Sequence, residues 1–102
     1  MSKRGRLAYI REVLREYPQI KKRPAETWSE RDARLVAMVD DILAETGCKR
    51  GGAARNEIID LVYFKRSHTL YGAAMRVSVG IRTAERWNAE LMEDVAKKMR
   101  LF

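Results

Sequence analysis

The run of residues 69–91 constrains the fold of this chain more than any other part of its sequence. Apolar residues recur there at helical spacing on both sides of a short break at Ser78. Ala74 supplies a small side chain where a second helix would have to cross closely, and Val77 and Val79 flank the break with apolar side chains. Beyond the break, the apolar spacing continues at Ala84, Trp87 and Leu91. The pattern predicts two helices joined by a tight turn, a helix-turn-helix.

The turn of this motif has two unusual residues. Ser78 occupies the position that glycine usually holds, and Gly80 occupies the capping position that serine or threonine usually holds. A left-handed backbone at Ser78 would cost about 1 kcal/mol relative to glycine. Glycine is still an acceptable helix cap. An ordinary helical hairpin, in which the small residues merely let two helices pack, is the alternative interpretation.

The N-terminal half shows clear helix boundaries. Pro18 is expected to end a first helix at or before Tyr17, because proline lacks an amide donor and restricts the residue before it. Residues 19–27 are expected to form a basic linker. Ser29 can cap the exposed amides of a second helix, and Asp32 three residues later completes a capping-box pattern.

The middle of the chain adds a third helix and completes the predicted fold class. Gly47 is expected to end the second helix in a left-handed conformation, and residues 48–53 to form a plain turn. A strongly apolar third helix is expected from about residue 54 to 65. We therefore predict an all-α protein, a small helical bundle of four to five helices with a C-terminal helix-turn-helix. Residues 1–24 would form a basic N-terminal helix and linker, and residues 25–102 the helical domain.

The charge of the chain is unevenly distributed. The net charge is +7, and residues 1–24 carry eight basic and two acidic side chains. Residues 25–47 carry two basic and six acidic side chains, whereas residues 48–102 carry eleven basic and six acidic ones. Basic ends suit a polyanion, because each Lys or Arg that neutralises a phosphate also releases a condensed counterion. A basic surface that only keeps the protein soluble is the alternative.

The composition argues against several other classes of protein. Cys48 and His68 are the single cysteine and the single histidine, which excludes an internal disulfide and a four-ligand zinc site. No apolar stretch approaches the roughly 18 to 20 residues of a membrane span, and no secretory signal is evident. His68 also lacks an evident nucleophile partner. We therefore expect a cytoplasmic protein of a bacterial host cell, with no enzymatic activity, cofactor, metal or membrane partner.

The helix that begins near Ile81 is the expected contact with double-stranded DNA. Helices of this motif enter the major groove by their N-terminal end, which places Arg82, Glu85 and Arg86 near base edges. An arginine there can form two hydrogen bonds with guanine, and for Arg86 contact with the DNA backbone is the alternative. Residues before the motif are expected to hold phosphates, which orient the protein without specifying sequence. The candidate DNA-contacting residues are Lys65, Arg66, Thr69, Tyr71, Arg76, Ile81, Arg82, Thr83, Glu85 and Arg86.

Three segments of the chain resemble a known family. The run I-I-D-L-V-Y-F-K-R-S-H-T-L-Y-G-A-A from Ile58, followed by V-S-V-G-I-R-T-A-E-R-W from Val77, resembles the C-terminal part of the RinA and ArpU families of phage transcriptional regulators. The early run I-R-E-V-L-R-E-Y-P-Q-I-K-K from Ile10 is similar to their N-terminal helix. This resemblance implies a helix-turn-helix like region four of sigma factors, and control of late phage genes.

Two other functions are consistent with the same residues. One is a DNA-recognition subunit of a phage packaging machine, since small terminase subunits also carry a helix-turn-helix. The other is a protein-interaction module whose basic face contacts RNA polymerase. A single motif of this size usually needs a second copy or a partner for useful affinity, so a homodimer is one expectation and contact with RNA polymerase another.

Overall fold

The computed structural model describes residues 3–100, and within them the chain is helical with no strand. The elements in chain order are α1 (Lys3–Lys21), the 3-10 turn η1 (Ala25–Thr27), α2 (Glu30–Gly47), α3 (Gly52–Ile59), the π-helical η2 (Asp60–Phe64), α4 (Leu70–Arg76) and α5 (Ile81–Lys98). The all-α class expected from the sequence is therefore confirmed. No helix of the described part is both long and apolar enough to cross a membrane.

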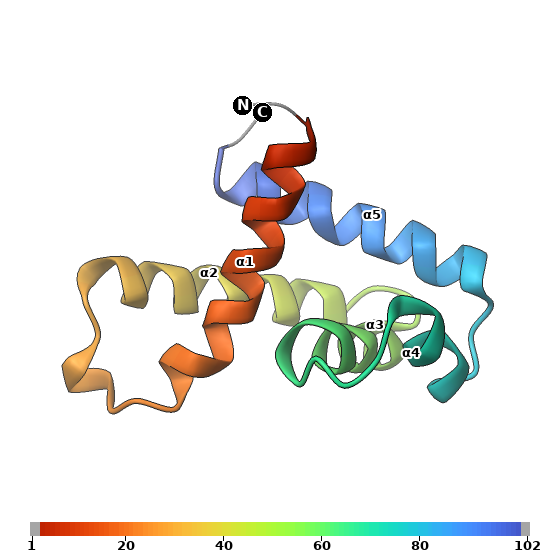
Figure 1. Ribbon diagram of the computed structural model, residues 1–102, viewed down its shortest axis with the longest axis horizontal. Helices are drawn as coiled ribbons and strands as arrows, with labels where there is room; N and C mark the ends of the chain where they lie inside the picture. Colours follow the sequence, from red (N-terminus) through yellow and green to blue (C-terminus); the bar gives the residue numbers. More distant parts are fainter. Residues whose placement is uncertain (1–2, 101–102) are drawn as a thin grey trace.

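The helices pack around two apolar clusters. Figure 1 shows α1 lying across α2 and α5, while α3 and α4 gather beside the start of α5, away from the turn between α1 and α2. The buried residues of the main core are Ile10, Val13, Leu14, Ile20, Leu35, Val36, Val39, Ile42, Ile59, Tyr63, Leu91, Met92, Val95 and Ala96. Those of the second core are Ile58, Leu61, Ala73, Ala74 and Ala84. The second core thus joins α3, η2, α4 and the first turns of α5.

Helix α1 continues through Pro18 for one further turn, so the prediction that it ends at or before Tyr17 is wrong. Pro18 removes one amide donor, but its own carbonyl accepts a hydrogen bond from the amide of Lys22 at 3.2 Å. Ile20 is buried in the main core, and the ring of Tyr17 packs against that of Phe64 with centroids 5.0 Å apart. Tertiary packing of this last turn therefore outweighs the local cost of proline.

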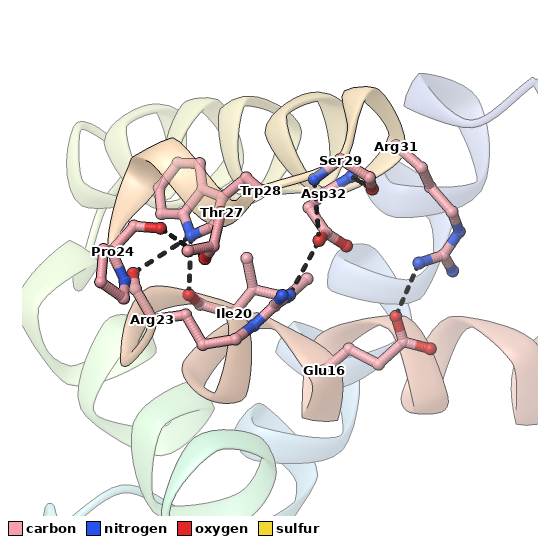
Figure 2. Close-up of polar contacts among 9 residues, drawn as sticks. All are labelled: Glu16, Ile20, Arg23, Pro24, Thr27, Trp28, Ser29, Arg31 and Asp32. Carbon is pink, nitrogen blue, oxygen red and sulfur yellow. Dashed lines mark hydrogen bonds and ion pairs between the residues drawn. The ribbon is translucent and has the colours of Figure 1, made fainter.

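The connection from α1 to α2 is closed by Trp28. Figure 2 shows its indole Nε1 donating to the carbonyl oxygens of Ile20 at 2.9 Å and Arg23 at 3.2 Å. These carbonyls lie at and just beyond the end of α1, where the regular helical hydrogen bonds stop, and the carbonyl of Ile20 also accepts from the amide of Arg23 at 3.0 Å. The basic linker predicted over residues 19–27 is corrected accordingly, because its first residues belong to α1 and its last ones form η1.

Helix α2 begins as the sequence predicts and ends differently. The hydroxyl oxygen of Ser29 accepts a hydrogen bond from the amide of Asp32 at 3.0 Å, and the carboxylate of Asp32 accepts one from the amide of Ser29 at 3.2 Å. The left-handed backbone predicted at Gly47 is wrong, because the positive φ of this turn, 73°, belongs to Gly51. A Cβ at Gly52 would lie 2.2 Å from the carbonyl oxygen of Gly47, so the reversal brings the two helices into backbone contact.

The third predicted helix is present but starts earlier and changes form. It begins at Gly52 rather than near residue 54, and at Asp60 it passes into η2. There the amide of Lys65 donates to the carbonyl of Asp60 at 2.8 Å, the wider spacing of a π-helical turn. Tyr63 of η2 is buried, and its hydroxyl donates to the side-chain oxygen of Asn88 in α5. Burial raises the pKa of this phenol. The side-chain hydrogen bond between Tyr63 and Asn88 thus links η2 to α5.

Candidate nucleic-acid interface

The turn between α4 and α5 reverses the chain through Ser78, whose φ is 60°. The amide of Ser78 donates to the carbonyl of Met75 at 3.2 Å, and the amide of Val79 donates to that of Ala74 at 3.0 Å. This pair of hydrogen bonds is the Schellman ending of a helix, in which glycine usually takes the left-handed position. Gly80 then caps α5 with an extended backbone and no side-chain hydrogen bond. The left-handed serine and the glycine cap expected from the sequence are both present.

Small side chains bring α4 against α5. Ala73 and Ala74 of α4 and Ala84 of α5 are at most 1% exposed and belong to the second core. Val77 and Val79 on the turn are half-buried against the same cluster. Because no large side chain separates the two helices at these alanines, one side of the first turns of α5 packs closely against α4.

The opposite side of these turns carries two free arginines. Arg82 and Arg86 lie four residues apart and therefore share one face of α5. Both are exposed, and neither forms an ion pair within residues 3–100. Glu85 is exposed beside them. We call Arg82, Glu85 and Arg86 the arginine face of α5.

The remaining candidate residues of the two helices have different surroundings. Ile81 is half-buried against the second core, and Thr83 is also half-buried. Arg76 is exposed at the end of α4. Tyr71 is 60% exposed, and Met75 one turn later is an apolar neighbour that is 65% exposed and so is not part of the core. The outer face of α4 therefore presents an aromatic ring and a thioether to solvent.

The loop before α4 contributes less free charge than its sequence suggests. Lys65 lies 3.1 Å from the carboxylate of Asp60, and the hydroxyl of Thr69 accepts a hydrogen bond from the amide of Gly72 at 3.1 Å. Both side chains therefore already have a partner in the fold. Arg66 is exposed, has a φ of 54° and forms no ion pair within residues 3–100. Of these three candidates, Arg66 has the charge most available for a ligand.

Ion pairs tie the later half of α5 to α3 and to the turn that precedes α3. The guanidinium of Arg55 lies 2.7 Å from the carboxylate of Glu90 and 4.8 Å from the centroid of the Trp87 ring. Lys49 lies 2.9 Å from the carboxylate of Asp94. Because the side chain of Arg55 is only 13% exposed, solvent screens its pair less than the others. These contacts neutralise two acidic side chains just beyond the arginine face.

A groove of about 700 Å³ lies between α1 and α5 and is not predictable from the sequence. Arg11 and Leu7 of α1 line one side, and Glu85, Asn88 and Met92 of α5 line the other. The two walls are far apart in the chain, so periodicity within either helix could not reveal the groove. Within residues 3–100, no three His, Cys, Asp or Glu side chains gather as a metal site would require.

No protein-family model, curated protein or solved structure matches this chain.

Proposed function

We propose that this chain is a sequence-specific DNA-binding protein that reads duplex DNA with a helix-turn-helix formed by α4 and α5. One observation carries the proposal. Arg82 and Arg86 are exposed without an ion pair in residues 3–100, while Ala84 between them is buried. A helix anchored on one side, with free guanidinium groups on the other, fits a major groove about 12 Å wide.

The side chains of the arginine face suit the edges of a guanine–cytosine pair. A guanidinium presents parallel N–H donors that match O6 and N7 of guanine, and each such contact discriminates by about 1–3 kcal/mol. Glu85 can accept a hydrogen bond from the amino group of cytosine. We therefore expect guanine at two positions of the recognised site, with cytosine as a neighbour.

The charges of the later turns limit how much of α5 enters the groove. Glu90 and Asp94 are paired within the fold, and Glu93 is exposed. Exposed carboxylates repel phosphates, so DNA contact is confined to the first two turns. Arg76 is exposed at the end of α4, and we propose that it contacts a phosphate bordering the major groove.

Regulation of transcription is the role that we propose for this DNA binding. The resemblance to the RinA and ArpU families supports it and points to phage or prophage genes. The net charge of +7 favours the nonspecific attraction to DNA by which such proteins find their sites.

The proposal is tested by replacing both arginines of the face, as Arg82→Ala/Arg86→Ala. The probes are a duplex selected from a random pool by the wild-type protein and an unrelated duplex of equal length. Losing two bidentate contacts should weaken binding to the selected duplex by at least about 30-fold, with a far smaller change on the unrelated one. Arg34→Ala, an exposed arginine of α2 without an ion pair in residues 3–100, is the matched control. Unchanged site preference at unchanged helicity would refute the assignment.

A further inference from the structure

One face of α1 carries arginines that form no ion pair with a carboxylate within residues 3–100. Figure 2 shows that cations near the turn between α1 and α2 are paired: Arg23 lies 2.8 Å from Asp32, and Arg31 lies 2.9 Å from Glu16. The arginines at positions 4, 11 and 15 have no such pair within residues 3–100. We call these three residues the α1 arginine stripe.

The stripe is straight and lies on one side of the helix. Intervals of seven and four residues place Arg4, Arg11 and Arg15 within an arc of about 40° and along about 16 Å of the helix. Arg4 and Arg11 are exposed, and Arg15 is half-buried, with its Nε buried and without an acceptor. Like charges four residues apart destabilise a helix, and a buried donor without an acceptor is also unfavourable. The stripe thus holds like charges close together and leaves one buried donor without an acceptor in the fold.

One residue of the stripe lies across a groove from α5, and the arginine face contributes one residue to the same groove. Arg11 lines the groove that Glu85 of the arginine face also lines. Further along α1, Arg15 and Arg66 line a cavity of about 360 Å³, to which Glu12 and Glu16 of α1 also contribute. The arginines of the stripe therefore extend from the groove beside α5 toward the loop that precedes α4.

We propose that the α1 arginine stripe binds the phosphate backbone of the same DNA duplex, along the strand that borders the DNA major groove entered by α5. This inference rests on the proposed function and adds a second, sequence-independent contact surface to it. Guanidinium groups form paired, charge-assisted hydrogen bonds with phosphate oxygens. One strand of B-DNA carries a phosphate for every 3.4 Å or so of axis, so about 16 Å of helix faces several of them. Glu85 and Glu93 lie on the α5 wall of the protein groove between α1 and α5. Their carboxylates would repel phosphates and so keep the DNA strand on the α1 side.

The composition of the stripe favours a polyanion over an acidic protein. Protein interfaces have an apolar centre, usually with aromatic residues. The exposed aromatic side chain of α1, Tyr9, lies about 160° around the helix from Arg11. Beside the stripe, Ala8 is exposed and small, and Leu7 is half-buried against the main core. A row of guanidinium groups without an exposed large apolar side chain matches repeated phosphates.

The test measures how binding depends on salt for Arg11→Gln/Arg15→Gln. The selected and unrelated duplexes are titrated at salt concentrations from about 50 to 200 mM, the range over which phosphate contacts dominate the change in affinity. Each lost phosphate contact flattens the slope of log affinity against log salt by about 0.9. Across this range the wild-type protein should therefore lose about tenfold more affinity than the double variant. The ratio of affinities for the two duplexes should not change, because phosphates carry no sequence information.

The single variants Arg11→Gln and Arg34→Gln complete the design. Each removes one positive charge from an exposed arginine, but Arg34 lies on α2 and lines a different groove. Arg11→Gln should flatten the slope and Arg34→Gln should not. Arg11→Gln also gives a clear result if the substitution at the half-buried Arg15 prevents folding, as checked by circular dichroism.

Each outcome separates this inference from the proposed function. If the wild-type protein binds the selected duplex and Arg11→Gln leaves the slope at the wild-type value, the stripe is not a phosphate contact, although the proposed function stands. If Arg34→Gln flattens the slope as much as Arg11→Gln, the effect belongs to net charge and the inference is overturned. If the wild-type protein retains no duplex even at about 50 mM salt, the proposed function itself fails.

Discussion

Replacing Gly80 with aspartate should make the protein more stable and a weaker DNA binder. Gly80 is the N-cap of α5, with φ −66° and ψ 148°, a backbone that any residue can adopt. A Cβ at this position would meet nothing within 4 Å, so the substitution introduces no clash. The new carboxylate can accept hydrogen bonds from the free amides of the first turn and interacts favourably with the positive end of the helix dipole.

The size of each effect follows from the same geometry. Replacing a glycine cap adds a few tenths of a kcal/mol, and a carboxylate at a helix N-terminus adds about 0.3–1 kcal/mol. A total near 1 kcal/mol should raise Tm by about 4 °C or more in a chain of this size. If the start of α5 enters a groove bordered by phosphates, the added charge should cost about 1 kcal/mol of binding, roughly a fivefold rise in Kd.

Gly80→Ser separates these two effects, because serine caps the helix without adding charge. Thermal unfolding and titration of the selected duplex are measured for both variants. The aspartate variant should melt above the serine variant and bind more weakly than it does. If Gly80→Asp binds the selected duplex as tightly as Gly80→Ser or more tightly, the start of α5 does not lie next to DNA phosphates.

Two further predictions concern local structure. Ser78→Gly should stabilise the protein by up to about 1 kcal/mol in urea unfolding, because φ at this residue is 60°; a loss of stability would contradict the strain inferred there. The hydrogen bonds from Arg23 and from the amide of Ser29 hold the pKa of Asp32 below its ordinary value of 3.8, so its contribution to stability is present above that pH and is lost as pH falls through the lowered pKa. Asp32→Asn should therefore weaken the decline in stability below about pH 4, and an identical acid unfolding profile in the variant would argue against this contribution.

Features that depend on a few neighbouring residues could be predicted from the sequence. The Ser29–Asp32 capping box is set by four consecutive residues, and the structure has it. The left-handed Ser78 follows from the need to reverse the chain between two helices within a few residues. The burial of Ala74 and Ala84 follows from helical spacing alone.

Features that depend on tertiary contacts could not be predicted in the same way. The turn of α1 after Pro18 persists because Ile20 is buried by other helices. The positive φ falls on Gly51 rather than Gly47 because α3 begins in backbone contact with the end of α2. Local propensity predicts that the first helix ends before Pro18 and that Gly47 takes the left-handed conformation. Packing between distant segments instead extends α1 to Lys21 and puts the left-handed residue at Gly51.

The candidate site is predictable from the sequence only in part. The helix-turn-helix pattern assigns Arg82 and Arg86 to the outer side of the second helix, and both are exposed. The sequence offered no sign that Lys65 is paired with Asp60, or that Arg11 lines a groove with Glu85. Ion pairs and grooves between distant segments follow from side-chain placement in three dimensions, which periodicity within one helix does not encode.

The central claim is that the first two turns of α5 read the sequence of a DNA duplex. The most direct measurement incubates the wild-type protein with a pool of random duplexes at about 0.15 M salt and sequences the bound fraction. We expect one short motif to be enriched, with guanine at two of its positions. A bound fraction as random as the input, or no retained duplex at all, would contradict the claim.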